Sequence, residues 1–419
     1  MAAAAPSAAV VGGGPAGAVA ALVLARRGVR VTVLESREGP ACKVGETLPP
    51  GLTPLLRHLG LESVLDRDGH LRSQGNRSWW GAARPVERAF LAAPQGPGWH
   101  VDRGRFEARL AEAACQAGAE WRWGSRVERC VRSRESGGAL GAGGSWQIEL
   151  GRTGGARRGS AAAEPPAGVL EADWLLDATG RRAHVSRQAA GARRVRYDRL
   201  VGVAAMLGPP RQTSPAAAGP AAPAHRAPPA PAPAVEEGYT WVEATPDGWW
   251  YSAALADGRL AVTLFGDGDL LERSLCGPGA DPAAWRRRLR QAPATRERIA
   301  ALAGGSQPAR LAVVPAESSR LDAIAGQGWL ALGDAAAAYD PLSSHGVAAA
   351  MGSGFYGGHA VADLLAGREE ARAAYLDLMQ RSYGAYLDLL RERYAAERRW
   401  PDAPFWRRRH QPGYAVDPL

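Results

Sequence analysis

A glycine pattern near the start of the chain has the spacing that close approach to a diphosphate group requires. G-x-G-x-x-G follows an apolar run and opens a segment of small residues, with a glutamate about twenty residues further on. The first glycine permits a tight turn, the second lets a pyrophosphate approach the backbone, and the third lets a helix pack on a sheet. Phosphates would face the helix N-terminus, and the glutamate would accept hydrogen bonds from a ribose. The predicted dinucleotide site comprises Gly12, Gly14, Pro15, Ala16, Gly17 and Glu35.

The elements that must position this site alternate between buried strands and helices. Short apolar runs bounded by turn residues predict strands, and longer segments with helical periodicity predict helices. Downstream, turn dipeptides between apolar runs predict an antiparallel sheet. We expect strands at 8–11, 29–35, 174–177, 239–243, 248–254, 260–265 and 329–332, and helices at 15–27, 103–118, 283–303, 346–365 and 369–399.

Composition and charge exclude several classes of site. The chain has 51 basic and 42 acidic residues, and Lys43 is its only lysine. With abundant Ala, Gly and Pro, this arginine excess indicates a solvated surface rather than a nucleic-acid site. Four cysteines without a C-x-x-C pair and histidines without H-E-x-x-H predict no metal site, and reduced thiols in a cytoplasm. Glycines interrupt the N-terminal apolar run, so we expect neither a signal peptide nor a membrane span.

Two later motifs narrow the identity of the dinucleotide. Asp177-Ala178-Thr179-Gly180 and Gly333-Asp334 follow the glycine pattern in order. Together the three resemble the flavin-binding signatures of the para-hydroxybenzoate-hydroxylase-like superfamily of FAD monooxygenases. The resemblance implies FAD as cofactor and O2 as co-substrate. It also implies that Asp334 hydrogen-bonds the ribityl chain and that Arg103 contacts FAD.

The resemblance also implies a fold class and a domain plan. The expected fold is α/β, with a Rossmann-like FAD-binding domain of the GR2 type, an inserted antiparallel-sheet substrate domain and a C-terminal helical segment. Residues 208–234 are rich in Pro and Ala and are predicted to be a disordered insertion. We assign residues 1–75, 100–190 and 305–367 to the FAD-binding domain, 76–99 and 191–304 to the substrate domain, and 368–419 to the C-terminal region.

Three segments carry a narrower resemblance. Residues 45–50 (G-E-T-L-P-P), 340–346 (D-P-L-S-S-H-G) and 247–252 (D-G-W-W-Y-S) resemble motifs of the flavin-dependent halogenase branch. That branch includes tryptophan halogenases. It also includes non-halogenating flavoproteins similar to LodB, GoxB and QhpG, which hydroxylate a tryptophan of a partner protein on the way to a tryptophylquinone. The chain looks most similar to this second group.

Three departures from the halogenase pattern favour a hydroxylase. Halogenases of this branch carry a lysine about thirty residues after the G-E pair, whereas residues 72–80 contain none and Lys43 precedes the pair. An arginine is a poor substitute, because its guanidinium stays protonated. Ser343 stands where tryptophan halogenases have a glutamate, and only Trp249 remains of their W-x-W-x-I-P motif.

A hydroxylase needs an aromatic ring near the flavin C4a-hydroperoxide and a group that accepts the ring proton. His345 and Glu46 are the catalytic candidates, although either side chain could merely cap or pack. The N–H groups and dipole of the segment containing Pro341, Ser344 and Gly346 would face negative charge on the flavin pyrimidine. The candidates for an aromatic substrate pocket, with core packing as the alternative, are Trp79, Trp80, Trp249 and Tyr251.

These features predict an FAD-dependent monooxygenase that hydroxylates an indole or phenol ring. The substrate would be an aromatic small molecule, a peptide or a partner protein, and the sharpest version is a tryptophan in quinone cofactor biogenesis. Electrons would come from NAD(P)H or a separate flavin reductase, because only one dinucleotide pattern is present. The alternatives are a natural-product tailoring hydroxylase, a divergent halogenase and, from a different class, a flavin-bearing interaction module without turnover.

Overall fold

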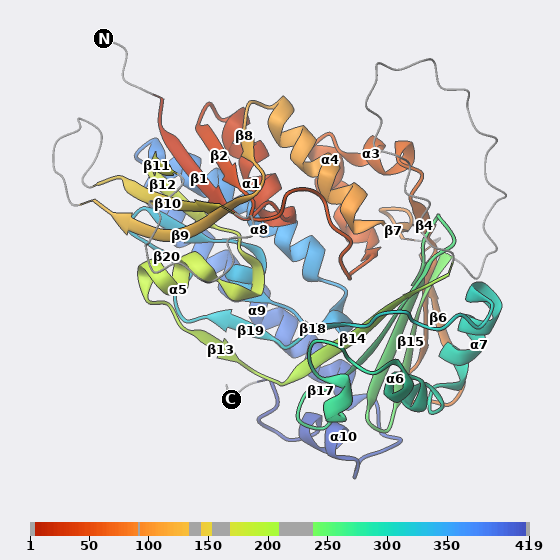
Figure 1. Ribbon diagram of the computed structural model, residues 1–419. Coiled ribbons are helices and arrows are strands. Elements are labelled where there is room, and N and C mark those ends of the chain that lie inside the picture. The colour runs from red at the N-terminus through yellow and green to blue at the C-terminus, as the bar shows by residue number, and fades with distance from the viewer. Residues whose placement is uncertain (1–4, 91–92, 134–143, 153–167, 209–237, 416–419) are drawn as a thin grey trace, which may run out of the picture.

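A six-stranded sheet forms the centre of the first half of the molecule (Figure 1). The computed structural model describes residues 5–90, 93–133, 144–152, 168–208 and 238–415. The sheet order is β20-β21-β12-β1-β2-β8, parallel except for the β20–β21 pair. Its strands are β1 (Ser7–Val11), β2 (Arg30–Leu34), β8 (Glu120–Arg122), β12 (Trp174–Asp177), β20 (Ala325–Gly326) and β21 (Trp329–Ala331). Such short apolar strands are typical of parallel sheets covered on both faces, and they confirm the α/β class.

Helices with small residues pack closely around this sheet. They are α1 (Pro15–Arg26), α4 (Arg103–Gln116) and α8 (Gly346–Leu365). A Cβ atom on Gly354 would lie 2.3 Å from the Ala16 carbonyl oxygen, so this glycine is what lets α8 approach α1. A three-stranded antiparallel sheet packs beside them, formed by β9 (Ser125–Arg132), β10 (Trp146–Arg152) and β11 (Gly168–Ala172).

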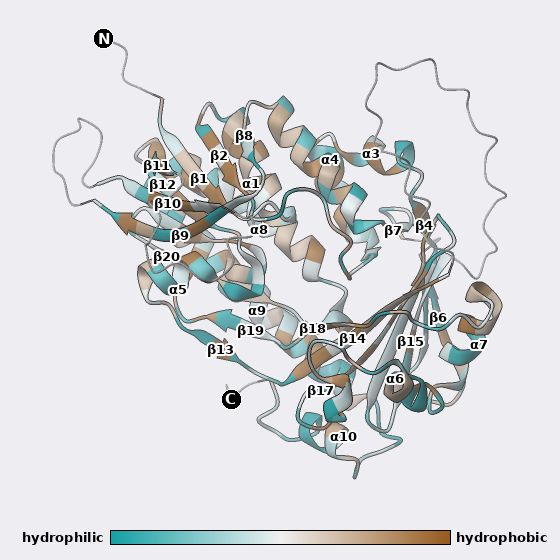
Figure 2. Cartoon of the chain, viewed as in Figure 1, coloured by the Kyte–Doolittle hydropathy of each residue, from teal (hydrophilic) through white to brown (hydrophobic). Residues whose placement is uncertain are grey.

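A seven-stranded sheet forms the second half, in the order β18-β14-β17-β16-β15-β5-β6. All neighbours are antiparallel except β5 and β15, which run parallel. Strand β14 is hydrophobic along most of its length (Figure 2). Its strands are β5 (Gly75–Trp79), β6 (Val86–Ala89), β14 (Leu200–Leu207), β15 (Tyr239–Thr245), β16 (Gly248–Ala254), β17 (Leu260–Asp267) and β18 (Ala312–Pro315).

Two helices, α6 (Pro282–Leu289) and α7 (Pro293–Ala303), cover the face of this sheet that points away from the six-stranded sheet (Figure 1). The prediction of one helical stretch over 283–303 is wrong, because the stretch is divided. Proline at the first position of α7 ends one helix and starts the next. Asp281 caps α6 through the backbone N–H groups of Ala283 and Ala284.

Two small sheets connect the halves. One has the order β3-β7-β4, with β3 (Thr47–Leu48), β7 (Gly98–His100) and β4 (Leu71–Ser73). The other has the order β13-β19-β22, with β13 (Arg194–Arg196), β19 (Ser319–Leu321) and β22 (Ala337–Ala338). Short helices α2 (Thr53–His58), α3 (Glu62–Arg67) and α5 (His184–Ala190) complete the connections.

The C-terminal region is helical, as predicted. A long helix, α9 (Glu370–Ala395), and the short α10 (Pro404–Arg409) pack back onto the main body (Figure 1). Four tyrosines of α9 are buried in the central core: Tyr375, Tyr383, Tyr386 and Tyr394. The predicted insertion at 208–234 lies outside the described residues, apart from Gly208.

Candidate functional site

A cavity of about 860 Å³ lies between the carboxyl ends of the parallel strands and the seven-stranded sheet. Ligand sites of roughly 300–1,000 Å³ hold molecules the size of a large cofactor, so the volume suits one. One end is lined by the glycine turn, Glu35 and Ser125–Val127. The other is lined by Glu46, Tyr251 and the start of α8. Each predicted cofactor-binding residue except Gly17 lines this cavity.

The glycine turn is built as the spacing requires. Gly12 has a φ of +108°, and a Cβ atom there would lie 2.2 Å from the Ala178 carbonyl oxygen. A Cβ atom on Gly17 would lie 2.0 Å from the carbonyl oxygen of Gly12, so this residue packs the helix rather than lining the cavity. Gly14 is different, because a Cβ atom there would meet nothing within 4 Å. It is the N-cap of α1 with no side-chain cap, so the helix N-terminus is open for an anion.

Glu35 follows β2 and closes one side of this turn. Its Oε2 accepts a hydrogen bond from the Gly13 N–H at 2.8 Å, and its Oε1 accepts from the Arg37 N–H at 2.9 Å. The carboxylate is 7% exposed and borders the cavity. Its lone pairs are therefore fixed in place for the hydroxyl groups of a ribose.

Asp334 lies at the same carboxyl edge of the sheet, in the 3-10 turn that follows β21. Its side chain is 36% exposed and borders the cavity, where Arg181 Nε lies 3.7 Å from its Oδ2. Arg181 also donates to the Tyr339 carbonyl oxygen at 2.9 Å. Sequence reasoning missed Arg181, although it directly follows the D-A-T-G motif. The aspartate of that motif is structural, since Asp177 accepts hydrogen bonds from Thr179 and Ser186.

Arg103 begins α4 and reaches toward the loop that carries the G-E pair. It donates to the Val44 carbonyl oxygen at 2.8 Å and pairs with Glu107. Lys43 also pairs with Glu107. Arg103 Nε is buried and has no hydrogen-bond partner among the described residues. An unpaired buried donor beside the cavity fits an anionic or carbonyl group of a cofactor.

The loop at the far end of the cavity turns sharply before α8. Residues 341–343 form a 3-10 turn, and Ser344 has a φ of +56°. Pro341, Ser344 and Gly346 line the cavity. His345, in contrast, is not one of the described residues that line it. Its Nδ1 lies 2.6 Å from the Ser343 carbonyl oxygen, which holds the ring against its own loop.

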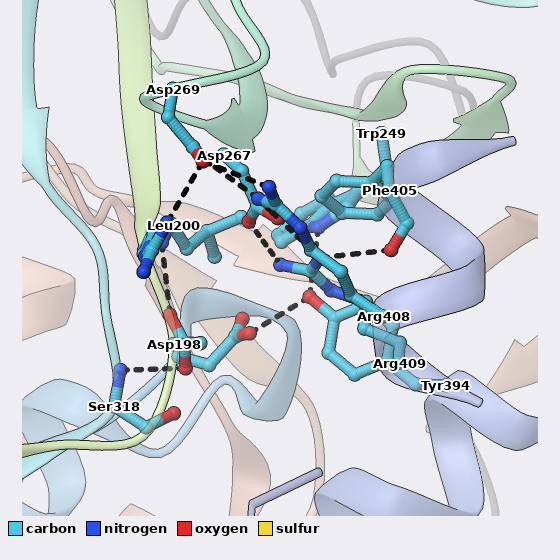
Figure 3. Close-up of polar contacts among 12 residues, drawn as sticks. Asp198, Leu200, Trp249, Asp267, Asp269, Ser318, Tyr394, Phe405, Arg408 and Arg409 are labelled. Carbon is cyan, nitrogen blue, oxygen red and sulfur yellow. Dashed lines mark hydrogen bonds and ion pairs between the residues drawn. The ribbon is translucent and has the colours of Figure 1, made fainter. Parts of the chain in front are cut away.

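A buried charged cluster lies behind this loop (Figure 3). Asp340 Oδ2 accepts from the Tyr394 hydroxyl at 2.8 Å, and burial together with Asp198 raises the pKa of Asp340 to about 7. Arg409 donates to Asp267 at 2.8 Å and lies over the Tyr394 ring. We name Asp198, Asp267, Asp340, Tyr394 and Arg409 the C-terminal ion cluster. It ties α9 and α10 to the loop at the cavity.

Glu46 is the buried carboxyl of the cavity. It is 2% exposed and borders the cavity just before β3. Burial raises its pKa, while the positive charge of Arg103 opposes the shift. Its side chain lies within hydrogen-bonding reach of the Tyr251 hydroxyl. Of the two predicted catalytic residues, the structure therefore brings Glu46, and not His345, to the cavity.

Comparison with known proteins identifies an FAD binding domain and similar flavoproteins. Residues 6–138 match the family of FAD binding domains. Over 408 residues the chain is 28% identical to the putative FAD-dependent oxidoreductase LodB of Marinomonas mediterranea, and the match covers 96% of each chain. A tryptophan 2-halogenase of Chondromyces crocatus is 26% identical over 375 residues, which cover 89% of this chain and 64% of the relative.

Solved structures agree with these relatives. The myxobacterial chondrochloren halogenase CndH superposes with a TM-score of 0.77 at 24% identity, covering 97% of this chain and 86% of its own. The peptidyl tryptophan dihydroxylase QhpG superposes with a TM-score of 0.67 at 25% identity, covering 97% and 79%. The chain is an FAD-dependent oxidoreductase whose fold is that of the FAD-dependent halogenases.

Three of the four predicted pocket aromatics of this oxidoreductase lie away from the cavity. Trp249 stacks on Phe265 with 4.2 Å between ring centroids, Trp80 packs against Trp406, and Trp79 packs against Trp241. For Trp80 and Trp249 the reason is that α10 and the end of α9 cover this part of the sheet, whereas Trp79 is half-buried in a cluster that includes Ala294 of α7. Tyr251 does line the cavity. Sequence reasoning missed its neighbours there, Thr263 and Phe265, which alternate on the adjacent strand β17.

Two kinds of feature, a membrane-spanning helix and a metal-binding cluster, are absent from the described residues. No described helix combines the length and apolar character needed to cross a bilayer. No cluster of three His, Cys, Asp or Glu side chains suited to a metal ion occurs within the described ranges.

Proposed function

We propose that this oxidoreductase is a monooxygenase that hydroxylates an aromatic ring, an indole or a phenol. The observation that carries the proposal is the far end of the cavity, where the buried carboxyl of Glu46 faces Tyr251 and Phe265 beside the α8 N-terminus. Bound FAD would supply two-electron activation of O2. The balanced reaction is ArH + O2 + NAD(P)H + H⁺ → ArOH + NAD(P)⁺ + H2O.

The residues of the cavity have distinct parts in this proposal. The open N-terminus of α1 and Glu35 would hold the pyrophosphate and ribose, and Arg103 and Asp334 would hold the flavin side. The seven-stranded sheet would provide the substrate side. Glu46 would accept the proton that the ring loses when the C–H bond is replaced by C–O. Enclosure of Glu46 keeps bulk water from competing for that proton.

A tryptophan in a peptide or partner protein is the substrate we favour. QhpG, which is 25% identical, is a peptidyl tryptophan dihydroxylase. A small or carrier-bound natural product is the second substrate class, since other relatives are halogenases. To test both, the FAD-loaded protein is supplied with NAD(P)H or a flavin reductase, ¹⁸O2, and tryptophan-containing peptides or free indoles and phenols. Incorporation of one labelled oxygen atom into the ring supports the proposal.

Halogenation is the rival activity, favoured by the tryptophan 2-halogenase relative. The chain's only lysine opposes it, because Lys43 is paired with Glu107 and lies before the G-E pair. The same incubation with bromide or chloride decides between the two. A halogenated product that requires halide would overturn the hydroxylase proposal, whereas a flavin that no reductant reduces would favour an interaction module.

A further inference from the structure

Three consecutive hydrogen bonds lead from Tyr251, a neighbour of Glu46 at the cavity, to a buried histidine. The Tyr251 hydroxyl lies 2.8 Å from Thr47 Oγ1, which lies 3.0 Å from Thr240 Oγ1. Thr240 Oγ1 lies 2.9 Å from His100 Nε2. At the other end, the Tyr251 hydroxyl is within reach of the Glu46 carboxyl. We name Glu46, Tyr251, Thr47, Thr240 and His100 the relay.

Strand pairing sets this geometry. Thr47 and His100 are partners in the β3–β7 pair. In the large sheet, Val242 pairs with Tyr251, so Thr240 and Tyr251 lie on one face by the alternation of strand residues. The small sheet thus faces the large one. Thr240 is 3% exposed and His100 is 0% exposed, so the inner end of the relay has no contact with solvent.

The donor and the acceptor of each hydrogen bond in the relay can be assigned by starting from His100. His100 Nδ1 lies 3.0 Å from the Ala254 carbonyl oxygen, which can only accept, so Nδ1 carries a proton. Burial, with the nearby charge of Arg298, lowers the pKa of His100 to about 3. The ring is therefore neutral and its Nε2 has no proton. Nε2 must accept from the Thr240 hydroxyl.

That assignment propagates outward. Because the Thr240 hydroxyl donates to His100, its oxygen accepts from the Thr47 hydroxyl. The Thr47 oxygen in turn accepts from the Tyr251 hydroxyl. The Tyr251 oxygen is then left facing Glu46 as an acceptor. Only a protonated carboxyl can donate to it. The relay therefore favours neutral Glu46 in the resting protein, in agreement with the effect of burial on this group.

We propose that the relay is a proton-transfer chain that lets the buried Glu46 change from acid to base. Glu46 passes its proton to Tyr251, Tyr251 passes its own to Thr47, Thr47 to Thr240, and Thr240 to His100 Nε2. Four O–H bonds break, and three O–H bonds and the Nε2–H bond of His100 form, which leaves a Glu46 carboxylate and a His100 imidazolium. The carboxylate then accepts the ring proton of the substrate. This role rests on the proposed hydroxylase function, whereas the resting polarity of the relay does not.

Charged neighbours bias the two ends. Arg103 on α4 favours the Glu46 carboxylate, and Arg298 on α7 disfavours the His100 imidazolium. Arg298 is buried and donates to the carbonyl oxygens of Ser252 and Tyr239. The proton on His100 is therefore held only transiently. Once Glu46 has given the ring proton to the oxygen atom that leaves as water, the proton on His100 returns along the relay to Glu46. Glu46 is the catalytic residue in this proposal, and the other members position and supply its proton.

Thr240→Val tests the relay, because valine keeps the shape of threonine and removes the hydroxyl. Thr47 would lose its acceptor and could turn toward Tyr251, which frees Tyr251 to donate to a Glu46 carboxylate. The pKa of Glu46 should therefore fall. The measurement is the infrared C=O stretch of the protonated carboxyl against pH, assigned with Glu46→Gln, in the FAD-loaded protein without substrate.

Two variants serve as controls. Thr240→Ser keeps the hydroxyl and should restore the wild-type titration. Thr245→Val removes an equally buried hydroxyl from the same strand, one that donates to the Gly248 carbonyl oxygen at 3.2 Å outside the relay, and it should leave the titration unchanged. If Thr240→Val leaves the pKa of Glu46 unchanged, or moves it no more than Thr245→Val does, the relay is wrong.

A measurement on the unaltered protein keeps the test valid even if Thr240→Val does not fold. Nitrogen NMR of ¹⁵N-histidine-labelled protein should show a signal from a neutral ring protonated at Nδ1 that His100→Asn removes. A His100 ring protonated at Nε2 would overturn the assigned direction. Failure of the hydroxylase proposal would appear separately, as a correct resting polarity in a protein that hydroxylates no aromatic ring.

Discussion

Two buried polar networks lie beside the cavity, the relay and the C-terminal ion cluster. Each contains a carboxyl group next to a tyrosine hydroxyl, but their other members differ. In the relay, the Glu46 carboxyl meets the Tyr251 hydroxyl, and in the C-terminal ion cluster the Asp340 carboxyl meets the Tyr394 hydroxyl. The cluster also contains the guanidinium of Arg409, which pairs with Asp267 and is 1% exposed. The relay contains no such cation, and its inner members are hydroxyls and a neutral imidazole.

That difference indicates that the cluster stabilises the fold and that the relay takes part in the reaction. A buried ion pair is costly to form and costlier to break, so a cation fixed among carboxylates holds its neighbours in one arrangement. A chain of hydroxyls can reverse all its hydrogen bonds at small cost, because each member both donates and accepts. We therefore expect substitutions in the cluster to change stability and substitutions in the relay to change turnover.

The largest effect should come from Arg409→Met. It leaves Asp267 buried at 3% side-chain exposure without its main partner, which typically costs about 3–5 kcal/mol. Urea unfolding measures the change. Arg408→Met is the matched control, since Arg408 is 36% exposed and its loss should cost less than about 1 kcal/mol. Equal losses in the two variants would contradict the cluster's role as a fastener.

Glu46→Gln should have its effect on turnover. The amide is nearly isosteric with the neutral acid, so the free energy of unfolding should change by less than about 1 kcal/mol. The rate of hydroxylation should fall roughly 10²-fold or more, since an acid–base group contributes about 10²–10⁴-fold. Single-turnover rates measure this, with exposed Glu392→Gln on α9 as the control. Unchanged turnover would remove Glu46 from the mechanism.

The same substitution in both networks compares them directly. Tyr394→Phe removes the hydrogen-bond partner of Asp340 Oδ2 and of the Trp249 indole N–H and should cost about 1–3 kcal/mol of stability. Tyr251→Phe should cost less stability but interrupt the relay, shifting the pH dependence of kcat while KM stays constant. If Tyr251→Phe instead lowers stability and Tyr394→Phe changes only the pH dependence of kcat, the roles assigned to the two networks are wrong.

Asp340→Asn should change the pH dependence of stability. Since the pKa of Asp340 is raised to about 7 when folded, the folded state holds the proton more tightly than the unfolded chain. Stability should fall as pH rises from about 4 to 7, by at most about 1.4 kcal/mol per pH unit. Asparagine mimics the neutral acid, so the variant should show a flatter profile in urea unfolding. An equally steep profile would mean that another group, Asp198 first, titrates in this range.

Local features of the cavity were predictable from the sequence. The φ of Gly12 and the close packing of Gly17 follow from the glycine pattern, and β1, α1 and β2 follow from apolar runs. In contrast, β14 was not predicted, and the parallel partner of β15 is β5, more than a hundred residues earlier in the chain. Long-range pairing leaves no periodic signal in either strand alone.

The placement of single side chains was less predictable. His345 lies directly between the cavity-lining Ser344 and Gly346, yet the left-handed backbone of Ser344 turns its ring toward the Ser343 carbonyl. Trp80 and Trp249 belong to apparently suitable motifs, but Trp406 and Tyr394 from the last two helices cover them. Burial of an indole depends on what packs over it, and here the covering residues come from the far end of the chain.

By itself, the sequence predicted a dinucleotide site from a glycine motif with demanding backbone geometry, and the resemblance of further motifs to known flavoproteins predicted FAD and the halogenase-like branch. It also determined that one lysine is available, and hence that halogenation lacks its usual residue. Only the tertiary structure decided which polar groups meet. Thr47, His100, Thr240 and Tyr251 come from four strands in two sheets, and nothing in their spacing along the chain links them. Hydrogen bonds depend on distances in space, which strand pairing and sheet packing set.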